Sequence, residues 1–310
     1  MTPIPILLDC DPGHDDAIAL LLAVASPELE LLGVTTVSGN QTLEKTTRNA
    51  LRVLEFAGRG DIPVAAGADR PLTRARYVAD YVHGESGMDG PDLPDPSRSP
   101  LDEHAVHFLA RTLRESERKV TLVPTGPLTN IALLLALHPE LEEKIERVVL
   151  MGGAIAEGNV TPAAEFNIWA DPEAAKRVFD SDLDVTMVGL DVTHKALVTS
   201  SDTERLRATG RTGAMVAQLL DFYGEFHARQ YGWDGSPIHD AVAVAQVSHP
   251  QLLETKFRHV EIDCEGELSR GRTLVDLWER METEPNTHVC VDIDARGFVE
   301  HLLDRLASLG

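Results

Sequence analysis

Apolar and polar positions along this chain form blocks that predict strands followed by helices. The first block, Ile4 to Leu8, has the character of a buried strand, and Ala17 to Ala25 is wholly apolar with the length of a helix. Further strand and helix pairs are predicted at 29–37 with 42–56, 119–123 with 128–137, and 146–151 with 173–179. Because strands alternate with helices, we expect an α/β fold with a parallel sheet covered by helices on both faces.

The second half of the chain is mostly helical before it returns to strands. Its predicted elements are a strand at 185–190, helices at 203–207, 213–226 and 240–247, strands at 258–263, 273–277 and 289–293, and a closing helix at 297–306. The longest irregular stretch, 81–100, is rich in Gly, Pro and Asp, and we interpret it as a lid. No repeat or linker is visible, so residues 1–310 are expected to form a single domain.

Four carboxylates crowd the junction between the first strand and the first helix, in the stretch Asp9-Cys10-Asp11-Pro12-Gly13-His14-Asp15-Asp16. In an open α/β sheet, ligands bind at this end of the strands. Like charges this close raise one another's pKa, whereas a divalent cation that prefers oxygen ligands would hold all of them ionised. The sequence therefore predicts a metal site here.

Polar residues also follow three other strands, in Ser38-Gly39-Asn40, Pro124-Thr125-Gly126-Pro127 and Met151-Gly152-Gly153. The needs of a turn would explain any one of these loops, but four together favour a binding site. His239 and Asp240 begin a further apolar helical segment. Asp240 is either an ordinary residue of a helix start or another oxygen ligand, and His239 is a candidate proton donor.

Two further groups of residues allow competing interpretations. Asn159, Glu165 and Asn167 lie in the connection after Met151 and suit the hydroxyls of a polyol, although solvated loop residues would look similar. Asp171, followed by a proline, is typical of a helix start and is given no catalytic role.

The aromatic residues are concentrated before His239. Phe222, Tyr223 and Phe226 have helical spacing, which favours a place in the core, whereas Tyr231 and Trp233 are better candidates to contact a planar ligand. His83 and His227 are weaker candidates on the same ground, and the remaining histidines are interpreted as surface or core residues.

Composition excludes several classes of protein. With 28 Lys and Arg against 50 Asp and Glu, the formal net charge is -22, which disfavours nucleic acid and anionic membranes as partners. Three cysteines without a paired spacing indicate a reducing compartment. There is no signal-like N-terminus, and the longest apolar run is far short of the ~20 residues that span a membrane. A soluble, cytoplasmic protein with a small-molecule ligand is expected.

Taken in order, these motifs closely resemble those of the inosine-uridine preferring nucleoside hydrolases. The matching segments are residues 9–17, 36–42, 83–87, 123–130, 150–153, 164–167 and 239–240. The resemblance covers almost the whole chain. It implies a Rossmann-like open, mostly parallel sheet flanked by helices, with extra helices near the active site. It also implies a bound calcium ion, a homotetramer or homodimer, and hydrolysis of the N-glycosidic bond of ribonucleosides in nucleoside salvage or catabolism.

The resemblance also implies roles for individual residues. The implied Ca²⁺ ligands are Asp11, Asp16, Asp240 and the main-chain carbonyl of Thr125, with Asp11 also activating the attacking water and His239 assisting the departing base. The implied substrate-binding residues are Asp15, Asn40, His83, Met151, Asn159, Glu165, Phe166, Asn167, His227 and Tyr231. Around His14 and up to Tyr231, the sequence looks more like the bacterial, pyrimidine-preferring members.

Two other classes of protein share part of this pattern. An aspartate-nucleophile phosphohydrolase also carries Asp-x-Asp after its first strand, but Gly-Thr follows that pair, whereas here Pro12 intervenes. No basic residue in the junction loops would receive a phosphate. A non-catalytic, calcium-dependent nucleoside-binding protein would lack part of the catalytic set, and none of that set is missing here.

Overall fold

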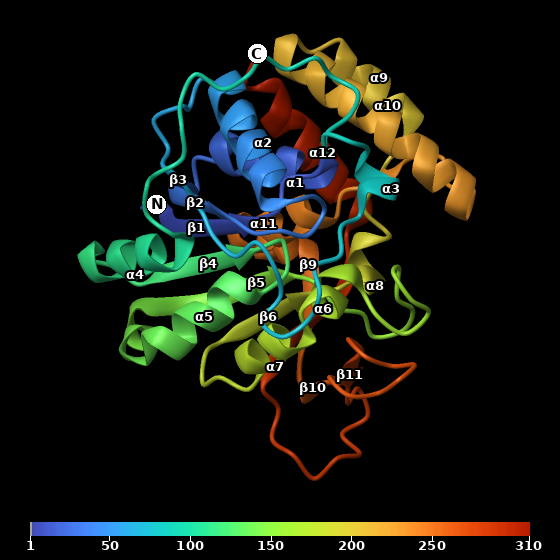
Figure 1. Ribbon diagram of the computed structural model, residues 1–310. Coiled ribbons are helices and arrows are strands. Elements are labelled where there is room, and N and C mark those ends of the chain that lie inside the picture. The colour runs from blue at the N-terminus through green and yellow to red at the C-terminus, as the bar shows by residue number, and fades with distance from the viewer. Residues whose placement is uncertain (1) are drawn as a thin grey trace.

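The computed structural model describes residues 2–310 and is built on one eight-stranded sheet (Figure 1). In sheet order the strands are β3 (Val64–Ala66), β2 (Leu29–Thr36), β1 (Ile4–Cys10), β4 (Val120–Pro124), β5 (Ile145–Met151), β6 (Val185–Val188), β12 (Thr287–Ile293) and β9 (Leu253–Arg258). Neighbouring strands are parallel except for β12 and β9. The expected α/β class with a mostly parallel sheet is confirmed.

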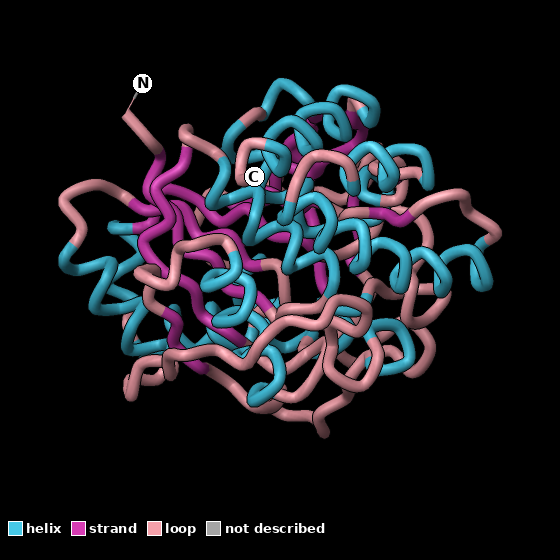
Figure 2. The backbone as a smooth tube through the Cα atoms, turned by 90° about the horizontal axis from the view of Figure 1, so that it is seen from above, coloured by secondary structure: helices cyan, strands magenta, loops and turns pink. Residues whose placement is uncertain are grey.

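Helices cover both faces of the sheet, and the alternation of side chains along β1 shows why both faces are apolar. Ile6 and Leu8 join one core, and Leu7 joins the other. The first core contains residues of α1 (His14–Ala25), α2 (Leu43–Phe56), α10 (Arg211–Tyr231), α11 (His239–Ser248) and α12 (Ala295–Ala307). The second contains residues of α4 (Ala105–Glu115), α5 (Thr129–Leu137) and α7 (Pro172–Phe179). Figure 2 shows the twisted strands in the interior, with helices and loops around them.

Helices α1 and α11 pack against each other and are apolar almost all round. Residues His14 to Ala23 of α1 and His239 to Val247 of α11 are buried without a break. A helix without a polar face is stable only inside a protein. Both helices therefore lie in the interior, and the outer layer beside them is formed by α10 and α9 (Ser200–Arg207).

The strand order reverses direction between β1 and β4, which are neighbours in the sheet. The chain moves from β1 to β2 and β3 on one side, and from β4 to β5 and β6 on the other. The loops after β1 and β4 thus diverge and leave a crevice at the carboxyl ends of these strands, where open α/β sheets bind ligands. Asp11 follows β1, and Thr125 follows β4.

Several elements differ from those predicted. The strand predicted at 258–263 is divided between the end of β9 and β10 (Val260–Ile262), which pairs with β11 (Thr273–Val275). The stretch interpreted as a lid begins within α3 (Asp80–His83). Elements not predicted are β3, α3, α4, β9, the 3-10 helices at Pro139–Lys144 and Pro250–Leu252, α6 (Phe166–Ala170), α8 (Leu190–Thr193), β7 (Leu197–Val198) and β8 (Ser236–Pro237).

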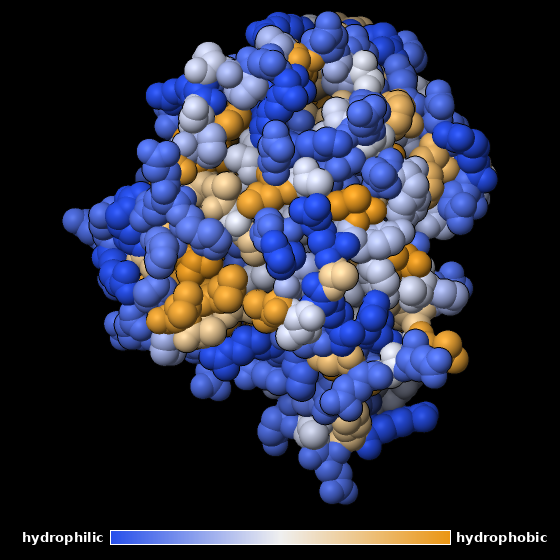
Figure 3. All heavy atoms as spheres, in the orientation of Figure 1, coloured by the Kyte–Doolittle hydropathy of each residue, from blue (hydrophilic) through white to orange (hydrophobic). Residues whose placement is uncertain are grey.

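The surface is mostly hydrophilic, with hydrophobic residues in a few small groups on the face drawn in Figure 3. Across residues 2–310, no helix combines the length and apolar character needed to cross a membrane. The three cysteines are free thiols, and Cys10 and Cys290 are buried.

Candidate active site

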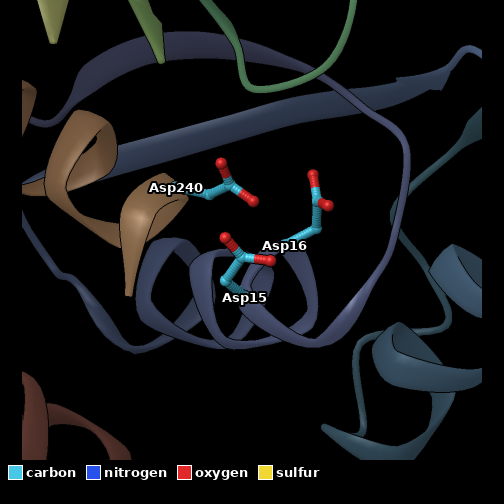
Figure 4. Close-up of side chains that lie close together, drawn as sticks. All are labelled: Asp15, Asp16 and Asp240. Atoms are coloured by element: carbon cyan, nitrogen blue, oxygen red, sulfur yellow. The ribbon is translucent and has the colours of Figure 1, made fainter. Parts of the chain in front are cut away.

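Three aspartates converge at the carboxyl edge of the sheet and form what we call the carboxylate cluster: Asp15, Asp16 and Asp240. Asp15 and Asp16 lie in the first turn of α1, and Asp240 lies in the first turn of α11. One carboxylate oxygen from each lies within 4.8 Å of the others, and Figure 4 shows the side chains facing a common space. The positive ends of two helix dipoles partly offset the negative charge here.

Asp11 lies beside the carboxylate cluster and is fully buried. Its Oδ2 accepts a hydrogen bond from the backbone N–H of Asn40 at 2.5 Å, while its Oδ1 has no partner within residues 2–310. Asp16 is held by the hydroxyl of Thr125 at 2.9 Å and by the side-chain amide of Asn40 at 3.0 Å. The loops after β1, β2 and β4 therefore fix these carboxylates together.

Burial is the main cause that raises the pKa of each of these carboxyl groups. It raises the pKa of Asp11 and Asp240 well above the usual range, with repulsion from neighbouring aspartates adding to the effect. Burial and the charge of Asp16 raise the pKa of Asp15 to about 8. No lysine or arginine lies among the described residues that line this site, so no side chain neutralises the charge.

The carboxylate cluster fits a hard divalent cation. Its ligands are all oxygens, and Asp11 adds a buried oxygen that lacks a partner. The Thr125 carbonyl accepts one hydrogen bond, from the side-chain amide of Asn167 at 2.7 Å. A carbonyl oxygen has two lone pairs, so one remains for an ion. The residue types and their burial thus agree with the predicted metal site.

A pocket of about 650 Å³ opens above the carboxylate cluster. The predicted site residues that line it are Asp15, Asn40, His83, Thr125, Met151, Asn159, Glu165, Phe166, Asn167, His227, Tyr231, His239 and Asp240. Asp11 and Asp16 are buried and do not line the pocket. The sequence motifs, which are spread over the whole chain, are therefore brought together around one space.

Glu165 holds one wall of the pocket in place through backbone contacts. Its side chain caps α6 by accepting from the N–H groups of Asn167 at 2.8 Å and Ile168 at 3.1 Å, and it also accepts from Gly153 at 2.9 Å. Burial raises the pKa of Glu165 to about 7. Asn159 accepts from the N–H of Phe166 at 2.9 Å. Glu165 and Asn167 are buried and fixed by the fold, whereas Asn159 is an exposed loop residue whose side chain keeps this one backbone contact.

Histidines and aromatic rings form another part of the pocket lining. Burial lowers the pKa of His83 and His239 well below the usual range and that of His227 to about 4, so these rings are neutral at neutral pH. Tyr231 stacks on Trp233 with ring centroids 4.4 Å apart. Neutral, apolar rings of this kind suit a planar, uncharged ligand.

Some lining residues were not found from the sequence. Tyr223 and Phe226, interpreted as core residues, line the pocket, whereas Trp233 supports Tyr231 from outside the lining. His194, left among surface or core residues, also lines the pocket. Its position directly after the strand predicted at 185–190 was the signal that could have found it, because loops after parallel strands meet at this edge. The other additions are Ala79, Tyr81 and Val82.

His14 was given no role from the sequence, yet it joins three parts of the structure. Its Nε2 lies 2.8 Å from the carbonyl of Asp89, and its Nδ1 lies 3.1 Å from Nδ1 of His83. The ring also stacks on Phe222 and Tyr223 of α10. His14 thus ties the start of α1 to the segment that carries His83.

A doubly wound sheet with buried carboxylates and a polar pocket at its switch point is the architecture of an α/β enzyme for a small ligand, and its carboxylates could hold a metal ion. The chain belongs to the inosine-uridine preferring nucleoside hydrolase family, whose profile matches residues 6–300. These enzymes cleave the N-glycosidic bond of ribonucleosides, and the chain is a ribonucleoside hydrolase.

The relatives are similar over nearly their full length. The chain is 54% identical over 306 residues to the pyrimidine-specific ribonucleoside hydrolase RihA of Citrobacter koseri, covering 98% of each chain. It is 54% identical over 305 residues to the protein of the same name from Escherichia coli, again covering 98% of each. Among solved structures, a purine-preferring ribonucleoside hydrolase from Gardnerella vaginalis superposes with a TM-score of 0.93 at 35% identity, covering 98% of each chain.

Proposed function

We propose that the chain is a calcium-dependent hydrolase of pyrimidine ribonucleosides. The observation that carries this proposal is the carboxylate cluster, which lies beneath a pocket lined with neutral amides, histidines and aromatic rings. Among the described residues that line this pocket there is no lysine or arginine to bind a phosphate, which disfavours nucleotides and supports an uncharged nucleoside.

The proposed Ca²⁺ ligands are Asp11, Asp16, Asp240 and the carbonyl of Thr125. Ca²⁺ takes 6 to 8 oxygen ligands, about 2.4 Å away, and tolerates irregular geometry. When bound, the ion would supply positive charge that keeps the carboxylates ionised and favours ionisation of a nearby water. Asp15 belongs to the carboxylate cluster together with Asp16 and Asp240. Its side chain is therefore also within reach of the ion or of a substrate hydroxyl.

The ribose is proposed to bind between the carboxylate cluster and the wall that Glu165 supports. Asp15, Asn40, Asn159, Glu165 and Asn167 supply hydrogen-bond donors and acceptors. Met151 and Phe166 also line the pocket and offer apolar surface to the sugar ring. The hydrogen bonds of Glu165 and Asn167 to the backbone would hold their side chains in place before the substrate arrives.

Asp11 is proposed as the general base. Its Oδ1 has no hydrogen-bond partner within residues 2–310, so a lone pair is free to accept a proton from water. During hydrolysis the C1′–N bond breaks with its electron pair leaving on the base, and the water oxygen bonds to C1′. The proton lost by the water balances the one that the free base finally gains.

His239 is proposed to assist departure of the base from the other side of the sugar. The ring lines the pocket and is neutral, so it offers one N–H to the negative charge that develops on the leaving base. His83, His227 and Tyr231 would contact the base itself. The preference for pyrimidines is supported by the 54% identity to hydrolases named as pyrimidine-specific.

Release of free ribose tests the proposal. Uridine, cytidine, inosine, adenosine and guanosine would be assayed with native protein, with chelator-treated protein, and after Ca²⁺ or Mg²⁺ is returned. We expect uridine and cytidine to be cleaved fastest, activity to disappear with the metal, and Ca²⁺ to restore it. Faster cleavage of purines would overturn the base preference, and activity unchanged by chelation would overturn the metal requirement.

A lack of ribose release from all five nucleosides would favour the non-catalytic alternative. In that case, equilibrium dialysis with uridine would separate a binding protein from one that acts on a modified nucleoside. The homo-oligomer implied by the family resemblance, a tetramer or a dimer, also stays a proposal, and light scattering during gel filtration would test it.

A further inference from the structure

A buried hydrogen bond joins the pocket histidine His239 to a residue that no sequence motif singled out. The Thr193 Oγ1 lies 2.7 Å from Nδ1 of His239. Thr193 is fully buried and His239 is 7% exposed, so water does not compete for this contact. Thr193 is the last residue of α8, which follows β6, whereas His239 is the first residue of α11.

The direction of this hydrogen bond follows from the surroundings of the hydroxyl. Within residues 2–310, Nδ1 of His239 is the sole partner of the Thr193 side chain. A buried hydroxyl that fails to donate loses a hydrogen bond at a cost in stability, so the hydroxyl donates and Nδ1 accepts. The proton of the neutral imidazole is then on Nε2, which makes no hydrogen bond within residues 2–310.

We propose that Thr193 is a positioning residue that fixes His239 in the tautomer with the proton on Nε2. This inference rests on the proposed role of His239 at the departing base. With the proton on Nε2, the ring offers a donor to the nitrogen or the carbonyl oxygen of the leaving pyrimidine. With the proton on Nδ1, the ring would present a lone pair and repel the negative charge that develops there.

The scaffold around Thr193 is suited to hold this orientation. The backbone N–H of Thr193 donates to the carbonyl of Gly189 at 3.1 Å, and the N–H of Leu190 donates to the carbonyl of Gly153 at 2.9 Å. These contacts fix α8 to the ends of β5 and β6. His194 packs edge-on against His239, with ring centroids 5.5 Å apart and planes at 62°, which restricts rotation of the ring.

The test uses two substitutions and two substrates with the Ca²⁺-loaded enzyme. Thr193→Val keeps the shape but removes the hydroxyl, and Thr193→Ser keeps the hydroxyl. Uridine needs help at its leaving group, whereas 4-nitrophenyl β-D-ribofuranoside releases an acidic phenol that departs as an anion. We expect Thr193→Val to lower kcat for uridine roughly tenfold or more, with little change in KM, and to leave the 4-nitrophenyl riboside nearly unaffected. Thr193→Ser should restore most of the uridine activity.

Controls separate this inference from the proposed function. Thr203→Val removes another buried hydroxyl, bonded to the carbonyl of Thr199 away from the pocket, and should change neither rate. In a His239→Ala background, Thr193→Val should cause no further loss, because the residue through which it acts is gone. A full uridine rate in Thr193→Val, or equal losses on both substrates, would overturn the inference while leaving the hydrolase function intact.

A measurement without a Thr193 substitution provides an independent check. Nitrogen-15 NMR of the wild-type histidine rings distinguishes the two tautomers, and loss of a signal in His239→Ala assigns it. A proton on Nε2 supports the inference, and a proton on Nδ1 overturns it. If His239→Ala left uridine hydrolysis unchanged, both the role of His239 and this inference would fail, while ribose release itself would still establish the hydrolase.

Discussion

At the scale of single residues, the four aspartates of the first loop show how position relative to a strand end decides what a carboxylate does. Asp9, still within β1, is bound by the hydroxyl of Thr35 at 2.6 Å and the amide of Asn130 at 2.8 Å. It therefore links neighbouring strands and loops. Asp9 and Asp11 each keep one carboxylate oxygen without a hydrogen-bond partner within residues 2–310, but Asp11 lies beyond the end of β1, and Asp15 and Asp16 have entered α1.

Replacing Asp11 by asparagine tests whether turnover needs its carboxylate. The amide keeps the shape of the carboxylate but cannot take a proton from water, so Asp11→Asn should lower kcat for uridine by at least about 100-fold. In the metal-free state the melting temperature should stay within roughly 3 °C of wild type, because a neutral amide replaces a buried carboxylate that is repelled by its neighbours. Asp180→Asn, on the surface, serves as the control. Near-normal turnover in Asp11→Asn would contradict the assignment of the general base.

The raised pKa values predict a pH dependence of stability in the metal-free protein. Burial raises the pKa of Asp9 to about 7 and that of Asp15 to about 8, both from 3.8. The folded state therefore binds more protons than the unfolded chain, and stability falls as pH rises toward 8. His14 and His227, with pKa lowered from 6.5 to about 4, act in the opposite direction, and their effect fades as the pH rises above the pKa of the unfolded ring.

Between pH 7 and 8 the histidines are mostly neutral in both states, so the carboxyl groups with raised pKa should dominate the change in stability. The melting temperature of chelator-treated protein is expected to drop by roughly a few degrees across this window. Added Ca²⁺ should remove most of the slope by stabilising the ionised carboxylates. Calorimetry at several pH values checks both points, and a melting temperature that rises over this window without metal would refute the explanation.

The sequence was most informative where several carboxylates lie close together along the chain. Four carboxylates in eight residues have few explanations, so the metal site was predicted from the residues alone. Thr193 gave no such signal, because a single hydroxyl after a strand is common, and His194 was marked only by its place after a predicted strand. Their contacts with His239 depend on α8 and α11 meeting in space, which the linear pattern does not encode.

At the scale of elements, the site is formed by the first turns of two helices and by two loops whose backbone lies close to Asp11. The first turns of α1 and α11 carry the carboxylate cluster, while the loops after β2 and β4 approach Asp11 through glycines. At Gly126 a Cβ would lie 2.7 Å from Oδ1 of Asp11, and at Gly39 a Cβ would overlap Oδ2 of the same residue. Glycine is needed at these positions for space.

Gly39→Ala should therefore damage the site by displacing Asp11. We expect uridine kcat to fall at least about tenfold and the affinity for Ca²⁺ to weaken, with the protein still folded. Gly60→Ala is the matched control, because its Cβ would come no closer than 3.4 Å to another atom. Circular dichroism checks the fold, and ribose release with a calcium titration checks the site. Wild-type calcium affinity and turnover in Gly39→Ala would contradict this prediction, because they would mean that the loop moves to accommodate the Cβ without displacing Asp11.

Elements with a strong apolar pattern were predicted well, and those held mainly by tertiary contacts were not. The helix predicted at 42–56 is found at Leu43–Phe56, and its buried positions follow one face. Strand β9 was missed because it is an edge strand whose central residues, Glu254 to Phe257, are exposed. Helices α6 and α8 have five and four residues, too short for any periodicity to be visible.

At the scale of the whole molecule, a net charge of -22 and a buried carboxylate cluster make a bound cation stabilising. Ca²⁺ at about 100 times its Kd would stabilise the folded state by about 2.7 kcal/mol. For a chain of this size, the melting temperature should rise by about 4 °C. Differential scanning fluorimetry of chelated protein during a calcium titration measures the shift. Asp240→Asn should reduce it strongly, and an unchanged shift in that variant would exclude Asp240 as a ligand.

The parallel α/β sheet with helices on both faces could be predicted from the alternation of patterns, because short strands and amphipathic or apolar helices recur along the chain. The order of the strands in the sheet could not be predicted, because no local sequence pattern indicates that β1 pairs with both β2 and β4. The expected single domain over 1–310 and the homo-oligomer stay predictions.

The distance along the chain between Asp16 and Asp240 has a consequence for kinetics. Their carboxylates meet only after α1, near one end of the chain, has packed against α11, near the other. Contacts between such distant segments are costly to form early, because a long loop must be closed. A cation that needs both residues thus has no complete site during the early steps of folding. Calcium should therefore slow the unfolding of this protein far more than it speeds its folding.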